Sequence, residues 1–176
     1  MKKCAKVLSC LTAILAVLFS SYVSVYASPD SNKRVPPDDF GSPVNVITYI
    51  DDDGCTVTEK TYLVLDEKKT RDKSGSGWYK NEKTKEWTGG STSTYYAQGY
   101  FTWGDGDVSV TSASGGISSV SGITISNRST TSGTGRYGYF FNKYAYVTFS
   151  CTATNSIGLS QDFSVTIRVS ESGNTI

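Results

Sequence analysis

Apolar and polar residues alternate along residues 145–154 of this chain. The alternation resumes at 163–169, after the four-residue segment Asn155–Gly158. Successive side chains of a β-strand point to opposite faces, so each run predicts a strand with one apolar face. Asparagine and glycine at the ends of the intervening segment favour a tight turn. The sequence therefore predicts an antiparallel hairpin with one face on a core.

Alternating runs earlier in the chain predict further strands. Residues 44–50 and 55–65 flank Asp51–Gly54, an aspartate-rich segment ending in glycine that is typical of a hairpin turn. Residues 93–103 predict another strand, with aromatic side chains on both faces. No stretch has convincing helical periodicity, and valine, threonine, tyrosine and serine dominate, as in strands. We expect an all-β fold, an antiparallel β-sandwich formed by residues 44–176.

Two polar segments are expected to contain only short strands. Residues 78–88 predict a short hairpin that turns at Asn81–Thr84. Residues 109–138 are crowded with serine, threonine and glycine, and they predict a meander of short strands and exposed turns.

The first 27 residues have the composition of a cleavable signal peptide. Three lysines precede an apolar run at residues 7–19, and Val25 and Ala27 place small residues at the third and first positions before the cut. We expect cleavage after Ala27; the alternative is retention of residues 7–27 as an N-terminal membrane anchor. Residues 28–43 contain all four prolines and form the expected linker to the domain.

Cleavage also changes the charge of the chain. Loss of Lys2, Lys3 and Lys6 leaves 14 of the 17 basic residues against 16 acidic residues, which is a net charge of −2. This weak charge gives no reason to expect nucleic acid or an anionic membrane as a partner. The short lysine-rich start is typical of bacterial signal peptides, and the chain as a whole resembles small exported β-sandwich proteins of Gram-positive bacteria. We expect a secreted, extracellular protein whose partner is a glycan or another protein.

Two cysteines remain after cleavage, Cys55 and Cys151. An even number of cysteines in an oxidising compartment favours a disulfide, and this one would close a loop of about 95 residues. In the chain-entropy description such a cross-link contributes on the order of 4–5 kcal/mol. We expect the pair to be bonded; two buried free thiols are the alternative.

The predicted C-terminal hairpin resembles strands F and G of immunoglobulin-like domains. Residues 149–158, FSCTATNSIG, match the pattern Tyr-x-Cys-x-Ala-x-Asn-x-x-Gly of those domains at every position but the first. The resemblance covers residues 145–169 and implies that Cys151 is the second cysteine of an inter-sheet bridge. Phe149 lacks the tyrosine hydroxyl, and Trp103 follows the first cysteine by 48 residues, much later than in the family.

Aromatic residues are the candidate ligand-binding groups. Residues 77–80, Gly-Trp-Tyr-Lys, followed by Trp87, resemble one repeat of the choline- or glucan-binding modules of Gram-positive surface proteins. Trp78 and Trp87 are therefore candidates, together with Tyr96 and Tyr100, which we expect to be exposed on one face of the strand at 93–103. The competing interpretation is that these tyrosines only cover the sheet, because tyrosine is a good strand former.

The chain contains no histidine. This absence excludes Ser-His-Asp and Cys-His hydrolases and disfavours catalytic zinc. An enzyme would need a carboxylate pair, for which Asp105 and Asp107 or the aspartates at 51–53 are the candidates, or a serine or threonine nucleophile with a lysine base. Asp105 and Asp107 are also weak metal candidates. A calcium site at Asp51–Asp53 is disfavoured because its acids are consecutive rather than alternate. We expect no cofactor and no catalytic residue.

Three function classes remain compatible with the sequence. A secreted binding or adhesion module, with a carbohydrate as one candidate ligand, is favoured by the sandwich pattern and the aromatic residues. A small exported toxin or bacteriocin-like protein is the alternative, and a histidine-independent glycosidase-type enzyme is disfavoured.

Overall fold

The computed structural model describes residues 34–66, 74–139 and 142–176. The strands are β1 (Asn45–Ile50), β2 (Thr56–Leu65), β3 (Gly75–Glu86), β4 (Thr92–Gly104), β5 (Asp107–Ser121), β6 (Ile123–Tyr137), β7 (Asn142–Asn155) and β8 (Ser160–Ser170). The predicted signal peptide, its cleavage site at Ala27 and residues 28–33 of the linker lie outside the described residues.

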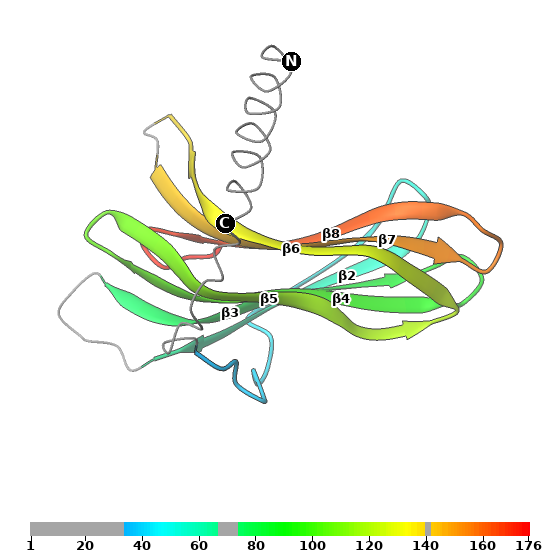
Figure 1. The fold of residues 1–176 in the computed structure, drawn as a ribbon, viewed down its shortest axis with the longest axis horizontal. Coiled ribbons are helices and arrows are strands. Elements are labelled where there is room, and N and C mark those ends of the chain that lie inside the picture. Colours follow the sequence, from blue (N-terminus) through cyan, green and yellow to red (C-terminus); the bar gives the residue numbers. More distant parts are fainter. Residues whose placement is uncertain (1–33, 67–73, 140–141) are drawn as a thin grey trace, which may run out of the picture. The chain divides into compact units, whose positions relative to one another are not determined.

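The strands form two antiparallel sheets that pack face to face (Figure 1). One sheet has the order β1-β2-β3-β4-β5 and the other has the order β6-β7-β8, so strands adjacent in sequence are adjacent in each sheet. The chain passes from the larger sheet to the smaller one between β5 and β6. Gly122 makes this passage with a φ of 69°, which glycine adopts without steric cost. The expected all-β fold, an antiparallel β-sandwich, is confirmed.

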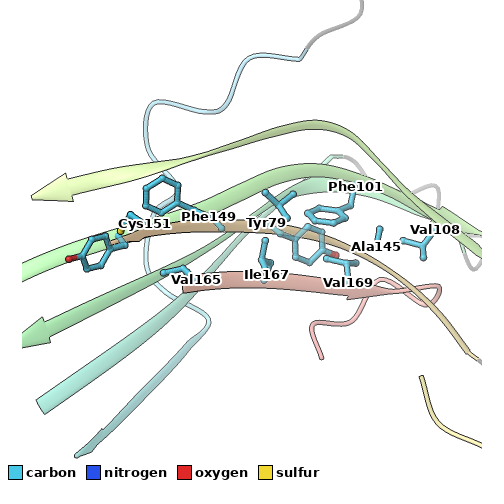
Figure 2. Packing of buried hydrophobic residues seen from close by; sticks show 12 residues of the cluster. Tyr79, Phe101, Val108, Ala145, Phe149, Cys151, Val165, Ile167 and Val169 are labelled. Atoms are coloured by element: carbon cyan, nitrogen blue, oxygen red, sulfur yellow. The ribbon is translucent and has the colours of Figure 1, made fainter. Parts of the chain in front are cut away.

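The apolar core lies between the two sheets. Along β7 buried residues alternate with half-buried ones, as the sequence pattern predicts. Figure 2 shows Tyr79 and Phe101 of the larger sheet beside Ile167 and Val169 of the smaller one. The Tyr79 and Phe101 rings meet edge to face with their centroids 5.4 Å apart, a favourable aromatic geometry.

The smaller sheet covers only part of the larger one. β8 contacts β3 and β4, and β7 contacts β4 and β5. β1 lies at the edge of the larger sheet, and all six of its residues are exposed. The first predicted hairpin is confirmed, because β1 pairs with β2 around the turn at Asp51–Gly54.

The hairpin expected at 78–88 does not form. β3 runs through the expected turn at Asn81–Thr84 and pairs with both β2 and β4. The polar side chains that suggested a turn have partners on other strands instead, on β2 for Lys83 and on β8 of the other sheet for Asn81. The Lys83 Nζ atom lies 2.8 Å from Glu59 Oε1, and Asn81 Nδ2 donates to the Thr166 carbonyl over 3.1 Å.

The short strands expected within residues 109–138 are two long strands, β5 and β6, of 15 residues each. Glycine in this segment serves close packing as well as turns. A Cβ atom at Gly115 would lie 2.6 Å from the Cβ atom of Phe149, so this glycine lets β5 approach β7.

The expected disulfide is not formed: Cys55 and Cys151 are both buried free thiols. The Cys55 Sγ atom lies before β2, 3.7 Å from Thr88 Oγ1. Cys151 lies within β7, opposite Phe163 of β8. The two thiols therefore have different neighbours. Strand alternation alone does not predict which residues lie beside each thiol.

Candidate functional site

Among the residues that the structure describes, four hairpin turns share one hydrogen-bond pattern. In each, the amide of the first residue donates to the carbonyl of the fifth, and the amide of a glycine at the fourth position donates to the carbonyl of the first. The four turns begin at Asp51, Trp87, Asn155 and Ser170. Each glycine has a φ between 76° and 84°, in the left-handed region that favours glycine.

Side chains reinforce two of these turns. Asp51 Oδ1 accepts hydrogen bonds from the amides of Asp53 and Cys55, at 3.1 and 2.9 Å. In the same way Asn155 Oδ1 accepts from the amides of Ile157 and Leu159, at 3.1 and 2.9 Å. Such side-chain bonds to the backbone favour aspartate and asparagine at the start of a turn and hold its shape.

The turns that begin at Asp51, Trp87 and Asn155 surround a cavity of about 580 Å³ at one end of the sandwich. Its lining comes from both sheets and consists of Asp53, Cys55, Lys85, Trp87, Thr88, Asn155, Ile157, Leu159, Ser160 and Gln161. A second cavity of about 230 Å³ shares Lys85 and Gln161 with the first and extends between β1–β3 and the start of β8. The two cavities therefore meet at one polar cluster.

Lys85 is the centre of that cluster, and its side chain is only 1 % exposed. Its Nζ atom lies 2.7 Å from Asp51 Oδ2 and 3.3 Å from Asp53 Oδ2, and it donates to Gln161 Oε1 over 2.7 Å. Gln161 Nε2 in turn donates to Asp53 Oδ2 over 2.6 Å. The three donors of the ammonium group thus have three oxygen partners.

Electrostatics keeps this cluster charged. Burial disfavours the ammonium form of Lys85, but hydrogen bonds from Lys85 to Asp51 and Asp53 outweigh it and raise the pKa of Lys85. The hydrogen bond from Lys85 lowers the pKa of Asp51. The aspartates of this turn therefore bind a buried lysine of the same chain. Its ammonium group would compete with calcium for these carboxylates.

Apolar groups form the other side of the cavity. Lys85 Nζ lies 4.3 Å from the centroid of the Trp87 ring, and Trp87 Nε1 donates to Ser93 Oγ over 2.8 Å, so the indole is fixed. Ile157 and Leu159 stand at the rim with 78 % and 64 % of their surface exposed. Exposed aliphatic side chains beside a fixed indole and oriented polar groups are typical of a ligand site.

The structure separates the four predicted aromatic site residues. Trp78 and Tyr100 meet edge to face with ring centroids 5.7 Å apart, and Tyr96 lies on the same face of β4 as Tyr100. Trp87 instead contributes to the end cavity. The expected exposure of Tyr100 is wrong, because Tyr100 is 2 % and Trp78 is 6 % exposed.

Residues of the expected linker explain this burial. The Arg34 guanidinium lies 4.3 Å from the centroid of the Tyr100 ring and 3.1 Å from Asp66 Oδ2. Tyr100 donates a hydrogen bond to the same Asp66 carboxylate, and Ser112 Oγ donates to the Arg34 carbonyl. Burial raises the pKa of Tyr100 most, and the hydrogen bond to the Asp66 carboxylate raises it further. A stacking platform on this face is therefore covered by the chain itself.

Asp105 and Asp107 lie at the exposed turn between β4 and β5. Asp107 Oδ1 lies 3.1 Å from Lys143 Nζ, whose hydrogen bond lowers the pKa of Asp107. Within the part of the chain that the structure describes, no three carboxylate, cysteine or histidine side chains gather as metal ligands.

Sequence reasoning missed Lys85, Gln161, Ile157 and Leu159. The available signal was the repeated turn, in which an aspartate, tryptophan, asparagine or serine is followed three residues later by glycine. Three such turns at one end of a sandwich bring their tips together, but the sequence does not state which turns share an end.

The chain matches no protein-family model, no curated protein and no solved structure. The fold and the cavity therefore define its class, an all-β sandwich with a candidate ligand site between hairpin turns. Residues 34–66, 74–139 and 142–176 include no helix with the length and apolar character that crossing a membrane requires.

Proposed function

We propose that this chain is a non-catalytic extracellular binding module and that the end cavity holds a carbohydrate ligand. The observation that carries the proposal is the cavity wall, in which the fixed Trp87 indole and the hydrogen-bonded Lys85 cluster meet exposed Ile157 and Leu159. A mostly apolar cavity with a few oriented polar groups is the usual form of a small-ligand site.

The lining matches the chemistry of a sugar ring. Sugar hydroxyl groups both donate and accept hydrogen bonds, and Asp53 and Gln161 offer carboxylate and amide atoms at the cavity wall. The C–H face of a sugar is apolar, and Leu159 and Trp87 supply apolar surface to pack against it. The rigid turns on either side reduce the entropy lost on binding.

Two features support a non-catalytic role. The chain has no histidine to serve as a general base near neutral pH. A glycosidase needs one carboxylic acid with a raised pKa, whereas lysine partners lower the pKa of Asp51 and of Asp107. The extracellular location rests on the signal peptide expected at residues 1–27.

A glycan array tests the proposal. The chain released by a secreting host is applied as the parent and as Leu159→Ser, which removes apolar surface at the exposed rim without disturbing the core. Leu65→Ser is the matched control, because Leu65 is exposed at the far end of β2 and lies outside the cavity lining. We expect the parent and Leu65→Ser to bind the same glycans and Leu159→Ser to bind at least several-fold more weakly.

Two results would overturn the proposal. The first is that the parent binds no glycan. The second is that Leu159→Ser and the parent bind equally well, which would place the site elsewhere on the molecule.

A further inference from the structure

β1 is an edge strand with apolar side chains exposed on both of its faces. Val46 and Ile50 on one face, and Ile47 and Tyr49 on the other, are 40–65 % exposed. Single exposed apolar residues are common on protein surfaces, but a strand apolar on both faces is not.

The backbone of β1 is also available on one side. The Asp51 amide donates to the Cys55 carbonyl, and β1 continues from this pair in regular antiparallel register with β2. Residues that exchange both hydrogen bonds with a partner alternate with residues that face away. The amides and carbonyls of Val46, Thr48 and Ile50 therefore point away from β2, toward the open edge.

The other three sheet edges carry features that oppose pairing with another strand. The pairing of β5 with β4 shifts register opposite Thr94/Tyr95 and Tyr100/Phe101 of β4, and the pairing of β6 with β7 shifts between Ser126 and Ser129 of β6. Bulges of this kind twist an edge away from a straight partner.

The exposed edge of β8 is covered from within the chain. Asn81 Nδ2 donates to the Thr166 carbonyl over 3.1 Å, and the Ile176 amide donates to the Arg168 carbonyl over 3.2 Å. Thr175 forms a further bridge with Val169. β1 has no such cover among the described residues, and its sequence, NVITYI, contains no proline and no charged residue.

We infer that β1 pairs with β1 of a second copy of this chain, so that two five-stranded sheets join edge to edge across a two-fold axis. The uncharged strand decides in favour of a second copy, because a two-fold axis places each residue near its own equivalent and any charge would meet its like. The inference does not depend on the proposed glycan site.

One register uses every outward backbone group. With Thr48 on the two-fold axis, Thr48 faces Thr48 of the second copy, and each Val46 faces the Ile50 of the other strand. On the opposite face each Ile47 lies across from the other Tyr49. Apolar and β-branched cross-strand pairs of this kind stabilise antiparallel strands.

The pairing is expected to be reversible. A six-residue strand buries much less surface than a standard stable interface, so dimer formation should depend on protein concentration. Sedimentation equilibrium of the chain released by a secreting host measures this directly. We expect the average mass to rise from that of one chain toward that of two as the concentration increases.

Substitution at the two-fold axis gives the specific test. Thr48→Lys places two ammonium groups opposite each other and should shift the dimer dissociation constant upward at least tenfold. Thr131→Lys is the matched control, because it makes the same threonine-to-lysine change at an exposed position of another edge strand, β6. This control should dimerise like the parent, and circular dichroism should show all variants folded.

A charge-swap mixture separates pairing from misfolding. Thr48→Glu alone should be monomeric, whereas an equal mixture of Thr48→Lys and Thr48→Glu should form a heterodimer that high salt weakens. A parent chain that is monomeric at every concentration overturns the inference and leaves a strand of another protein as the occupant. A dimer that persists in Thr48→Lys also overturns it, because the interface would then lie elsewhere.

Discussion

The Lys85 ammonium donates a hydrogen bond to the Gln161 side-chain oxygen over 2.7 Å, and this bond joins the two sheets at the wall of the end cavity. Lys85 belongs to β3 and Gln161 to β8. The same ammonium binds the aspartates of the β1–β2 turn, so one buried charge connects this turn with β3 and β8. The shape of the cavity therefore depends on a polar cluster as well as on apolar packing.

Replacement of Lys85 by methionine should lower the free energy of unfolding by about 2 kcal/mol. The change leaves the Asp51 carboxylate and the Gln161 oxygen without their cation in a half-buried setting, and loss of hydrogen bonds to a charged group costs about this much. Urea denaturation of the secreted chain measures it. Asp53→Asn is the control: its carboxylate is 57 % exposed, so its loss should cost less than about 1 kcal/mol. Equal losses in the two variants would show that Lys85 does not organise the cluster.

Stability should fall at acid pH because of Asp51. The hydrogen bond from Lys85 holds the pKa of Asp51 below its usual 3.8, so the unfolded chain takes up this proton at a higher pH than the folded chain. The contribution of Asp51 to the free energy of unfolding is therefore complete above about pH 5 and is lost as the pH falls through 3.8 and below.

Urea denaturation at a series of acidic pH values checks this dependence. Asp51→Asn should be less stable than the parent near neutral pH and should lose less stability on acidification. Asp52→Asn is the matched control, since Asp52 is the exposed neighbour outside the Lys85 cluster. An Asp51→Asn chain with the same acid profile as the parent would contradict the assignment.

Gly115→Ala should destabilise the sandwich, whereas Gly116→Ala should not. A Cβ atom at Gly115 would lie 2.6 Å from Phe149 Cβ and 3.0 Å from the Tyr96 carbonyl oxygen, both of which are fixed in the sheets. Overpacking of this kind costs about 1–3 kcal/mol. A Cβ atom at Gly116 would meet the hydroxyl end of the Tyr96 side chain at 3.1 Å, and that side chain can move. Thermal unfolding of both variants tests the difference, and equal melting temperatures would contradict it.

The chain recovered from a secreting host should begin at Ser28. Val25 and Ala27 are small residues at the positions that signal peptidase requires, and the apolar run before them is short. Intact mass and N-terminal sequencing give the first residue directly. A chain that keeps residues 7–27 and stays with the membrane fraction would support the anchor alternative instead.

The hairpins were predictable because their signal is local. β7 and β8 each carry one apolar face, and the pattern alone gives the turn between them at Asn155–Gly158. β3 was not predictable in this way. Its polar residues look like a turn in isolation, and only their partners on other strands, such as Glu59 opposite Lys83, make a continuous strand favourable.

The candidate site was less predictable than the fold. Trp87 was selected from the sequence, but Lys85 looks like one of many surface lysines until β8 brings Gln161 against it. Tyr100 was expected to be exposed because one face of β4 must face away from the core. Arg34, which is 66 residues earlier in the sequence, lies over its ring. Contacts between residues so far apart in sequence leave no local pattern.

The two cysteines should be free in the folded protein and unreactive until it unfolds. Cys55 and Cys151 are 5 % and 3 % exposed, and burial raises the pKa of the Cys151 thiol, so little of the reactive thiolate forms there near neutral pH. Iodoacetamide, followed by intact mass analysis, should add few labels to the native secreted chain. In denaturant without a reductant it should add a label to each of the two thiols.

Cys151→Ser separates this expectation from the disulfide alternative. With free thiols, the variant should lose stability only through burial of a polar hydroxyl, by about 1–3 kcal/mol, and should unfold identically with and without reductant. With a disulfide, the parent would be destabilised by reductant, since a cross-link over about 95 residues constrains the unfolded chain strongly. A denatured parent that takes up label only after reduction would show that the bond forms in the secreted protein.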